Sequence, residues 1–180
     1  MRVIAGKFKG RKLFGPKGDS FRPTLDRVKE SVFNVLGQDL VDSNVLDLFC
    51  GSGALGIEAI SRGAMRATFV DFDSKVMNLA RKNIQNLGLE KKAKFQQMDV
   101  FDFLNKHKNL TYDIILADPP YDKLYGTQIC ADILVNNVLK SRGIVVLERG
   151  KKEEVSAEGY HMAKNLSFGQ TEVDFFINEA

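Results

Sequence analysis

The 180-residue sequence predicts an α/β fold: a mostly parallel sheet covered by helices on both faces and finished by an antiparallel hairpin. Two observations support this prediction. From residue 45 onward, short apolar segments alternate with segments of helical periodicity, which is the pattern of right-handed βαβ units. Near the C-terminus the alternation stops, because two strand-like segments follow each other with no helix between them.

The individual elements follow from periodicity and from their end signals. Thr24 and Ser74 can cap helices that Gly37 and Gly88 end, and a shorter helix is expected at residues 54–62. Parallel strands are expected at residues 45–49, 67–70, 93–97, 112–117 and 144–147. The hairpin is expected from strands at residues 160–163 and 173–177, around a turn at residues 167–169.

Composition places the chain among ordinary soluble proteins. Apolar residues make up 44% and charged residues 27%, and no apolar run approaches the roughly 20 residues that a membrane span needs. Cys50 and Cys130 lie far apart and form no C-x-x-C pair, so they indicate neither a disulfide framework nor a zinc site. We therefore expect residues 1–180 to form a single cytoplasmic domain, monomeric, without a metal ion or a membrane contact.

Basic charge is concentrated in an N-terminal extension, residues 1–22. Short apolar stretches at residues 3–4 and 13–14, around a glycine-containing stretch at residues 6–10, suggest short strands joined by a turn. Basic side chains on such a strand pair can follow a phosphate backbone; alternatively, they form a solvated edge strand whose lysines block aggregation. Against the single acid Asp19, the segment carries Arg2, Lys7, Lys9, Arg11, Lys12, Lys17 and Arg22.

The first predicted parallel strand runs into a glycine loop. Gly51, Gly53 and Gly56 fit G-x-G-x-x-G at a strand-to-helix turn, a pattern that also describes dinucleotide-binding proteins. Asp47 favours a different cofactor, because a carboxylate near the mouth of the loop would repel a pyrophosphate but suit an ammonium and a sulfonium. S-adenosylmethionine carries both of these groups. The plain alternative is a tight turn that only packs a helix on the sheet.

Two further acids follow the next two strands. Asp71 can accept hydrogen bonds from both hydroxyls of a ribose, and Asp99 can accept one from an adenine amino group, with the Val100 N–H nearby. Asp71 and Asp99 could each instead be a solvated strand end, and Asp73 is expected to be a surface or capping residue. The expected cofactor site is completed by loop residues Phe49, Gly51, Ser52 and Gly53.

Asp118-Pro119-Pro120-Tyr121 follows the fourth parallel strand, at the carboxyl edge of the sheet beside the glycine loop. An exocyclic amino group is a poor nucleophile because its lone pair is delocalised into the ring. Two acceptors aimed at its hydrogens favour the pyramidal nitrogen, and the Asp118 side chain and the Pro119 carbonyl are such acceptors. Consecutive prolines stiffen the turn and remove competing N–H donors. Asp118 is also expected beside the cofactor, and Tyr121 offers a ring for base stacking. The plain alternative is a proline-rich turn with a capping tyrosine.

These motifs resemble those of the bacterial 16S ribosomal RNA guanine-N2 methyltransferases. The glycine loop and Asp-Pro-Pro-Tyr are shared with DNA adenine and other amino methyltransferases, whereas the N-terminal motifs are more specific. The resemblance covers nearly the whole chain and rests on residues 2–6, 10–13, 22–31, 47–56, 61–64 and 118–121.

The resemblance implies a Rossmann-like class I methyltransferase fold with a seven-stranded sheet. It also implies S-adenosylmethionine as donor and, as substrate, 16S rRNA in an assembled or assembling small ribosomal subunit, with guanine 966 in standard rRNA numbering as the target. Arg22, Thr24 and Arg27 lie where the extension meets the domain, where they could orient the RNA, close over the cofactor, or simply start a helix. The family often has Glu where Asp71 stands and a small residue at Cys50, and residues 168–171 match its closing turn only loosely.

Three other functions remain open at this point. The same motif would serve N6 methylation of DNA adenine, although a sequence-specific DNA enzyme usually needs a recognition domain for which 180 residues leave little room. The glycine spacing alone would suit an NAD-dependent oxidoreductase. A binding protein that has lost catalysis is disfavoured by the intact Asp-Pro-Pro-Tyr motif.

Overall fold

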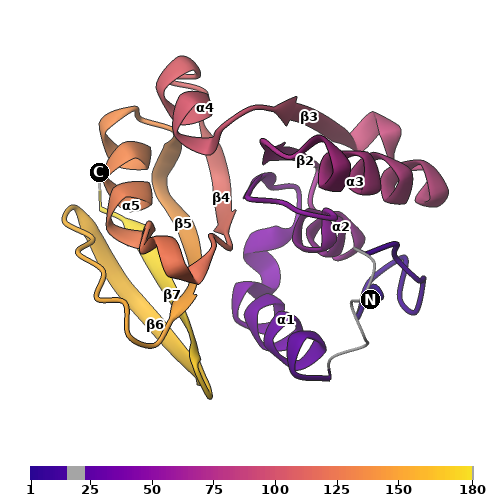
Figure 1. The fold of residues 1–180 in the computed structure, drawn as a ribbon, viewed down its shortest axis with the longest axis horizontal. Helices are drawn as coiled ribbons and strands as arrows, with labels where there is room; N and C mark the ends of the chain where they lie inside the picture. The colour runs from indigo at the N-terminus through magenta and orange to yellow at the C-terminus, as the bar shows by residue number, and fades with distance from the viewer. Residues whose placement is uncertain (16–22, 180) are drawn as a thin grey trace.

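The computed structural model describes residues 1–15 and 23–179 (Figure 1). Within them, one sheet of seven strands has the order β3-β2-β1-β4-β5-β7-β6. The strands are β1 (Asn44–Leu48), β2 (Arg66–Asp71), β3 (Ala93–Gln97), β4 (Tyr112–Ala117), β5 (Leu139–Gly150), β6 (Tyr160–Phe168) and β7 (Thr171–Asn178). The α-helices are α1 (Pro23–Leu36), α2 (Ala54–Ser61), α3 (Ser74–Leu87), α4 (Val100–Lys106) and α5 (Gly126–Val135). Among these residues, no helix combines the length and the apolar character that crossing a membrane requires.

The sheet has the predicted mixture of directions. Strands β1 to β5 pair in parallel, whereas β7 pairs antiparallel with both β5 and β6. Because β1 lies between β2 and β4, the connection that follows β1 leads to one side of it and the connection that follows β3 leads to the other side. The carboxyl ends of β1 and β4 therefore flank a topological switch point, where open α/β sheets bind ligands.

Alternate residues of the strands build one hydrophobic core on each face. On one face, Val45, Ile114 and Leu116 pack with α1, α2 and α3. On the other, Leu46, Leu48 and Ile115 pack with α4 and α5. Since side chains alternate along a strand, Asp118 and Glu148, which follow Leu116 and Val146 by two positions, belong to the α1 face.

The predicted N-terminal strand pair is confirmed only in part. Residues 1–3 and 11–13 pair antiparallel around a turn: Arg2 and Lys12 form a bridge, and the Val3 N–H donates to the Arg11 carbonyl at 3.0 Å, but neither arm forms a strand. Helix α2 satisfies the backbone here: the N–H groups of Ile4 and Ala5 donate to the two Glu58 carboxylate oxygens at 2.8 and 2.9 Å. Gly6 adopts φ +80°, and a Cβ there would lie 1.9 Å from the Ser61 carbonyl oxygen, so the segment packs directly on the helix.

Several predicted boundaries also shift. Helix α1 begins at Pro23, because proline suits the first helical turn, so Thr24 lies inside the helix and does not precede it. The cap of α3 is Asp73, whose side chain accepts the Lys75 N–H at 2.7 Å, and Ser74 is the first helical residue. Helix α2 ends one residue earlier than predicted, and β5, β6 and β7 are longer, which moves the hairpin turn to residues 169–170.

Candidate active site

Asp47, in β1, anchors the glycine loop between β1 and α2. Its Oδ2 accepts the Gly56 N–H at 2.8 Å, and its Oδ1 is buried with no partner among the described residues. Only 1% of Asp47 is exposed, and burial, with a smaller contribution from the Asp71 charge, raises its pKa to about 7. The carboxylate therefore lies beneath the loop and not at its mouth, where it was expected.

Asp71, at the end of β2, ties the loop to the next turn. Its Oδ2 accepts the Gly51 N–H and its Oδ1 accepts the Asp73 N–H, both at 3.0 Å. Each oxygen retains a second lone pair, so the carboxylate can still accept from a ribose hydroxyl. Asp71 therefore holds the loop in position and remains available to a ligand.

Asp99, after β3, caps a helix. Its Oδ1 accepts the N–H groups of Phe101 and Asp102 at 2.8 and 3.2 Å at the start of α4. Asp99 is exposed and Val100 is buried, and neither lines the two cavities described below. The structure thus accounts for Asp99 as a capping residue, and the predicted contact with adenine stays a prediction.

The three glycines of the loop have different surroundings. A Cβ on Gly56 would lie 2.4 Å from the Phe69 ring, so close helix-to-sheet packing requires this glycine, and Gly53 adopts φ +79° with a Cβ position 3.2 Å from Ala80. Gly51, at φ +53°, has no atom within 4 Å of the position its Cβ would take. Its backbone therefore faces open space, which fits the close approach of S-adenosylmethionine.

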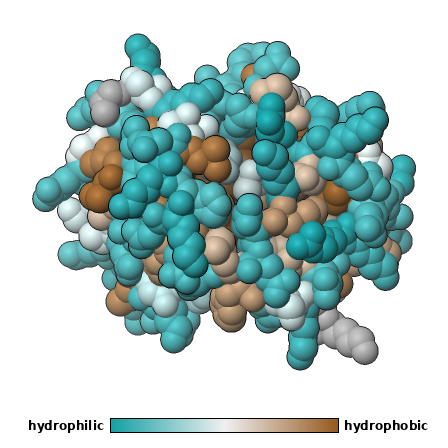
Figure 2. Space-filling view, turned by 90° about the horizontal axis from the view of Figure 1, so that it is seen from above, coloured by the Kyte–Doolittle hydropathy of each residue, from teal (hydrophilic) through white to brown (hydrophobic). Residues whose placement is uncertain are grey.

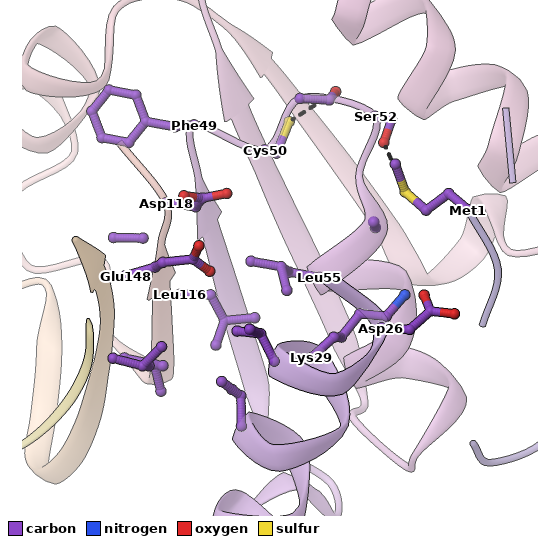
Figure 3. Close-up of a pocket in the computed structure, with 17 residues that line it drawn as sticks. Met1, Asp26, Lys29, Phe49, Cys50, Ser52, Leu55, Leu116, Asp118 and Glu148 are labelled. Carbon is purple, nitrogen blue, oxygen red and sulfur yellow. Dashed lines mark hydrogen bonds between the residues drawn. The ribbon is translucent and has the colours of Figure 1, made fainter. Parts of the chain in front are cut away.

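Two cavities meet at the switch point. One, of about 290 Å³, lies on the α1 face and is lined by the loop residues Phe49, Gly51 and Ser52 together with Asp118 and Glu148. Figure 3 shows the Asp118 and Glu148 side chains on the same side of this cavity, and Lys29 and Asp26 at another end of it. The other, of about 420 Å³, is lined by Phe49, Asp71, Phe72, Asp118, Pro119, Pro120, Tyr121 and Glu148.

Asp118 differs from the three acids before it. Among the described residues, none donates a hydrogen bond to its side chain. The carboxylate opens into the cavity, yet the protein around it removes much of the water that would stabilise its charge. This desolvation raises the pKa of Asp118 well above its usual value, and the neighbouring Glu148 and Asp47 carboxylates raise it further.

The Asp-Pro-Pro-Tyr turn presents a second free acceptor. The Pro120 carbonyl accepts the Lys123 N–H at 3.1 Å, whereas the Pro119 carbonyl accepts no hydrogen bond from the described residues. Asp118 and Pro119 both line the larger cavity, and the joint action of their two acceptors on an amino group stays a prediction.

Tyr121 is tied to the neighbouring strands. Its hydroxyl donates to Glu148 Oε1 at 2.5 Å and lies 3.1 Å from Thr171 Oγ1. Burial raises the pKa of Tyr121, and the hydrogen bond with Glu148 raises it further. The residue is 39% exposed, so its ring is partly open to the cavity, and stacking with a base remains a prediction.

An aromatic cluster borders the same edge of the sheet. Phe49 adopts φ +56°, a conformation that side chains other than glycine rarely take. Its ring stacks on Tyr125 at 6.2 Å between centroids and meets Phe101 edge-on at 6.4 Å. Phe72, just after β2, is 69% exposed beside Asp71. Phe49 and Phe72 therefore give an apolar lining to the cavity that Asp71 and Asp118 also line; Phe49 was predicted in this region and Phe72 was not.

The predicted RNA-binding residues lie mostly on the N-terminal segment. The Arg2 guanidinium pairs with Asp26 at 3.2 Å, and the Arg11 guanidinium donates to the Asn86 carbonyl at 3.3 Å. Arg22 lies outside the described residues, as does the side chain of Thr24. The exposed basic residues of the predicted set are Arg2, Lys7, Lys9, Arg11, Lys12 and Arg27. Figure 2 shows one face of the molecule, which is mainly hydrophilic, with hydrophobic residues in small separate groups.

The sequence analysis missed several cavity residues. Glu148 comes directly after the strand predicted at residues 144–147, as Asp118 does after the fourth strand, and this position is a usable signal. Met1 and Lys29 carry no such signal. Met1 lines the cavity next to Ser52, whose hydroxyl donates to its Sδ at 3.5 Å, and Lys29 donates to the Arg2 carbonyl at 2.7 Å.

Comparison with known proteins identifies the relatives of this chain. The family described as "Conserved hypothetical protein 95" matches residues 1–177. The Ribosomal RNA small subunit methyltransferase D of Haemophilus influenzae is 36% identical over 172 residues, covering 94% of this chain and 89% of the relative. The protein of the same name from Buchnera aphidicola subsp. Acyrthosiphon pisum is 32% identical, covering 85% of this chain and 80% of the relative.

Solved structures agree with the fold. The Escherichia coli protein yhhF has a TM-score of 0.88 at 31% identity, covering 100% of this chain and 98% of that one. An RNA methyltransferase from Salinibacter ruber in complex with S-adenosyl-L-homocysteine, at 17% identity and a TM-score of 0.66, covers 86% of this chain and 92% of that one and shares the fold. By its match over nearly the whole length, this chain belongs to the family of the ribosomal RNA small subunit methyltransferases D.

Proposed function

We propose that this chain transfers a methyl group from S-adenosylmethionine to the exocyclic N2 of a guanine in 16S rRNA. The target is guanine 966 in standard rRNA numbering, within an assembled or assembling small ribosomal subunit. The observation that carries the reaction is the Asp118 carboxylate, which opens into the cavity beside the Pro119 carbonyl. Neither group accepts a hydrogen bond from the residues that the structure describes. The names of the relatives support the substrate class.

The residues around the loop suit the proposed donor. S-adenosylmethionine supplies a methyl group on a sulfonium centre, which an amine nitrogen can attack. Asp71 beside the loop contributes negative charge to the cavity that it lines, which favours a cofactor carrying an ammonium and a sulfonium, whereas Asp47 anchors the loop backbone. The open space beside Gly51 admits the cofactor next to the loop backbone.

Asp118 and Pro119 then act on the amino group of the base. Hydrogen bonds from the N2 amino group to the carboxylate and to the carbonyl favour the pyramidal nitrogen. Asp118 can then take the proton that N2 releases. The raised pKa of Asp118 makes it a better proton acceptor than an exposed carboxylate. The stiff diproline turn fixes both acceptors in advance, which is preorganisation.

The basic N-terminal segment would hold the RNA. Its exposed Lys7, Lys9 and Lys12 can contact phosphates without reading sequence, and Glu58 anchors the segment to α2 through the Ile4 and Ala5 N–H groups. Because such contacts release counterions, we expect RNA affinity to fall steeply as salt rises.

The test uses labelled S-adenosylmethionine and small ribosomal subunits from cells that lack this gene. After reaction the RNA is digested and the labelled nucleoside is identified. We expect N2-methylguanosine from 16S rRNA. Label in any other nucleoside, or no transfer despite bound cofactor, would contradict the proposed substrate.

A further inference from the structure

Glu148 is held next to Asp118 by the register of the sheet. β4 and β5 are parallel neighbours, with Leu116 opposite Val146 and Ala117 opposite Leu147. Continuing each strand by one residue places Asp118 opposite Glu148, with both side chains on the same face of the sheet. Both carboxylates line both cavities, and Figure 3 shows them on one side of the cavity on the α1 face.

The orientation of Glu148 is fixed through one of its oxygens. Oε1 accepts the Tyr121 hydroxyl, which Thr171 supports from β7. Among the residues that the structure describes, none donates to Oε2. Burial also raises the pKa of Glu148, so a ligand that brings N–H donors would compensate a desolvated negative charge.

Two adjacent carboxylates are complementary to one base in particular. The Watson–Crick edge of guanine presents two neighbouring donors, the N1–H and the N2 amino group. Adenine presents an amino group beside N1, which is an acceptor and would face a carboxylate unfavourably. Enzymes that act on a base removed from its stack read this edge by hydrogen bonds.

We propose that Glu148 accepts the N1–H of the target guanine and thereby selects guanine over adenine, while Asp118 accepts from N2. This inference rests on the proposed function and assigns Glu148 the role of a specificity residue. Accepting the N1–H also adds electron density to the ring to which N2 is attached, which assists the nitrogen as a nucleophile.

The experiment measures kcat/KM for two substrates: small ribosomal subunits carrying guanine, or adenine, at the position that the native enzyme methylates. The ratio of the two constants is compared between the native enzyme and Glu148→Gln. A glutamine amide can donate to adenine N1, so we expect the guanine-to-adenine ratio to fall roughly 10- to 100-fold. The matched control is Glu158→Gln, which removes the same charge from an exposed site and leaves the ratio unchanged.

A second variant separates base reading from loss of support. Tyr121→Phe removes the hydroxyl that holds Glu148 but keeps the carboxylate, so guanine remains preferred even where the rate falls. The affinity of Glu148→Gln for the cofactor, measured by calorimetry, stays within about twofold of the native value, because the proposed contact is with the base.

The outcomes separate the two proposals. If the native enzyme forms no N2-methylguanosine, the proposed function fails. If it does, and Glu148→Gln keeps the native guanine-to-adenine ratio, the function stands and the role of Glu148 is overturned. A ratio that falls in Glu148→Gln and not in Glu158→Gln supports it.

Discussion

The acids at the ends of β1, β2 and β3 differ from those at the ends of β4 and β5. Asp47, Asp71 and Asp99 each accept backbone N–H groups from their own loops and helix starts. Asp118 accepts none within the described chain, and Glu148 keeps one oxygen free. Asp47 and Asp71 therefore hold the glycine loop and Asp99 holds the start of α4, whereas Asp118 and Glu148 keep acceptors available for a substrate.

The local sequence explains this difference. Asp99 accepts from the N–H groups two and three residues later, and Asp73 accepts from the one two residues later. After Asp118, the next two positions are Pro119 and Pro120, which have no N–H. The diproline thus removes the N–H two residues after Asp118, which is the donor that Asp99 and Asp73 both use in their own turns.

The largest expected effect comes from Asp118→Ala. Removing a preorganised group that stabilises the transition state lowers the methyl-transfer rate by roughly 10²- to 10³-fold. Cofactor affinity should change no more than a few fold, because the loop acids remain in place. Single-turnover kinetics and calorimetry measure the two quantities, and full transfer activity in this variant would refute the assigned chemistry.

A pH comparison tests the burial of Asp47. Its folded pKa of about 7 lies above the usual value of 3.8, so the folded state binds the extra proton and native stability falls as pH rises from about 4 to 7. Asp47→Asn lacks this ionisation. The difference between its melting temperature and that of the native protein should therefore shift in favour of the variant by several degrees between pH 5 and pH 8. The control Asp122→Asn changes an exposed carboxylate and should show no such gain. Parallel pH curves for Asp47→Asn and the native protein would contradict a buried, titrating Asp47.

Pro120→Ala tests the role of the diproline directly. Alanine restores an N–H two residues after Asp118, where the equivalent N–H reaches Asp99 and Asp73 in their turns. A hydrogen bond to a charged group is worth about 1.5–3 kcal/mol, so we expect the transfer rate to fall roughly tenfold or more as the new donor competes with the substrate. Unchanged kinetics, with the new hydrogen bond visible in a crystal structure, would count against this explanation.

The smallest expected effect is that of Asp99→Ala. Loss of an N-cap costs about 1 kcal/mol, which lowers the melting temperature of a chain of this size by roughly 2–4 °C. Transfer at saturating cofactor should stay near the native rate. A loss of cofactor affinity of tenfold or more, measured by calorimetry, would instead give Asp99 the adenine contact that the sequence suggested.

The sequence predicted the parallel strands and the hairpin because each carries its own pattern of apolar residues. It also located Asp118 and the glycine loop, since both follow strands directly. It could not predict that Glu58 would anchor the N-terminal segment to α2, because that contact joins residues more than 50 positions apart. Separation in sequence likewise hid Met1 and Lys29 among the cavity residues.

The most direct test of the difference between the two groups of acids measures two variants side by side. Cofactor dissociation constants and single-turnover methyl-transfer rates are determined for Asp71→Ala and Asp118→Ala. We expect Asp71→Ala to weaken cofactor binding roughly tenfold or more, with transfer largely restored at saturating cofactor, because the freed Gly51 and Asp73 N–H groups loosen the loop. Asp118→Ala should show the opposite pattern, with near-native binding and lost transfer. Two variants that lose binding and transfer to the same extent would contradict the division of roles between the two groups.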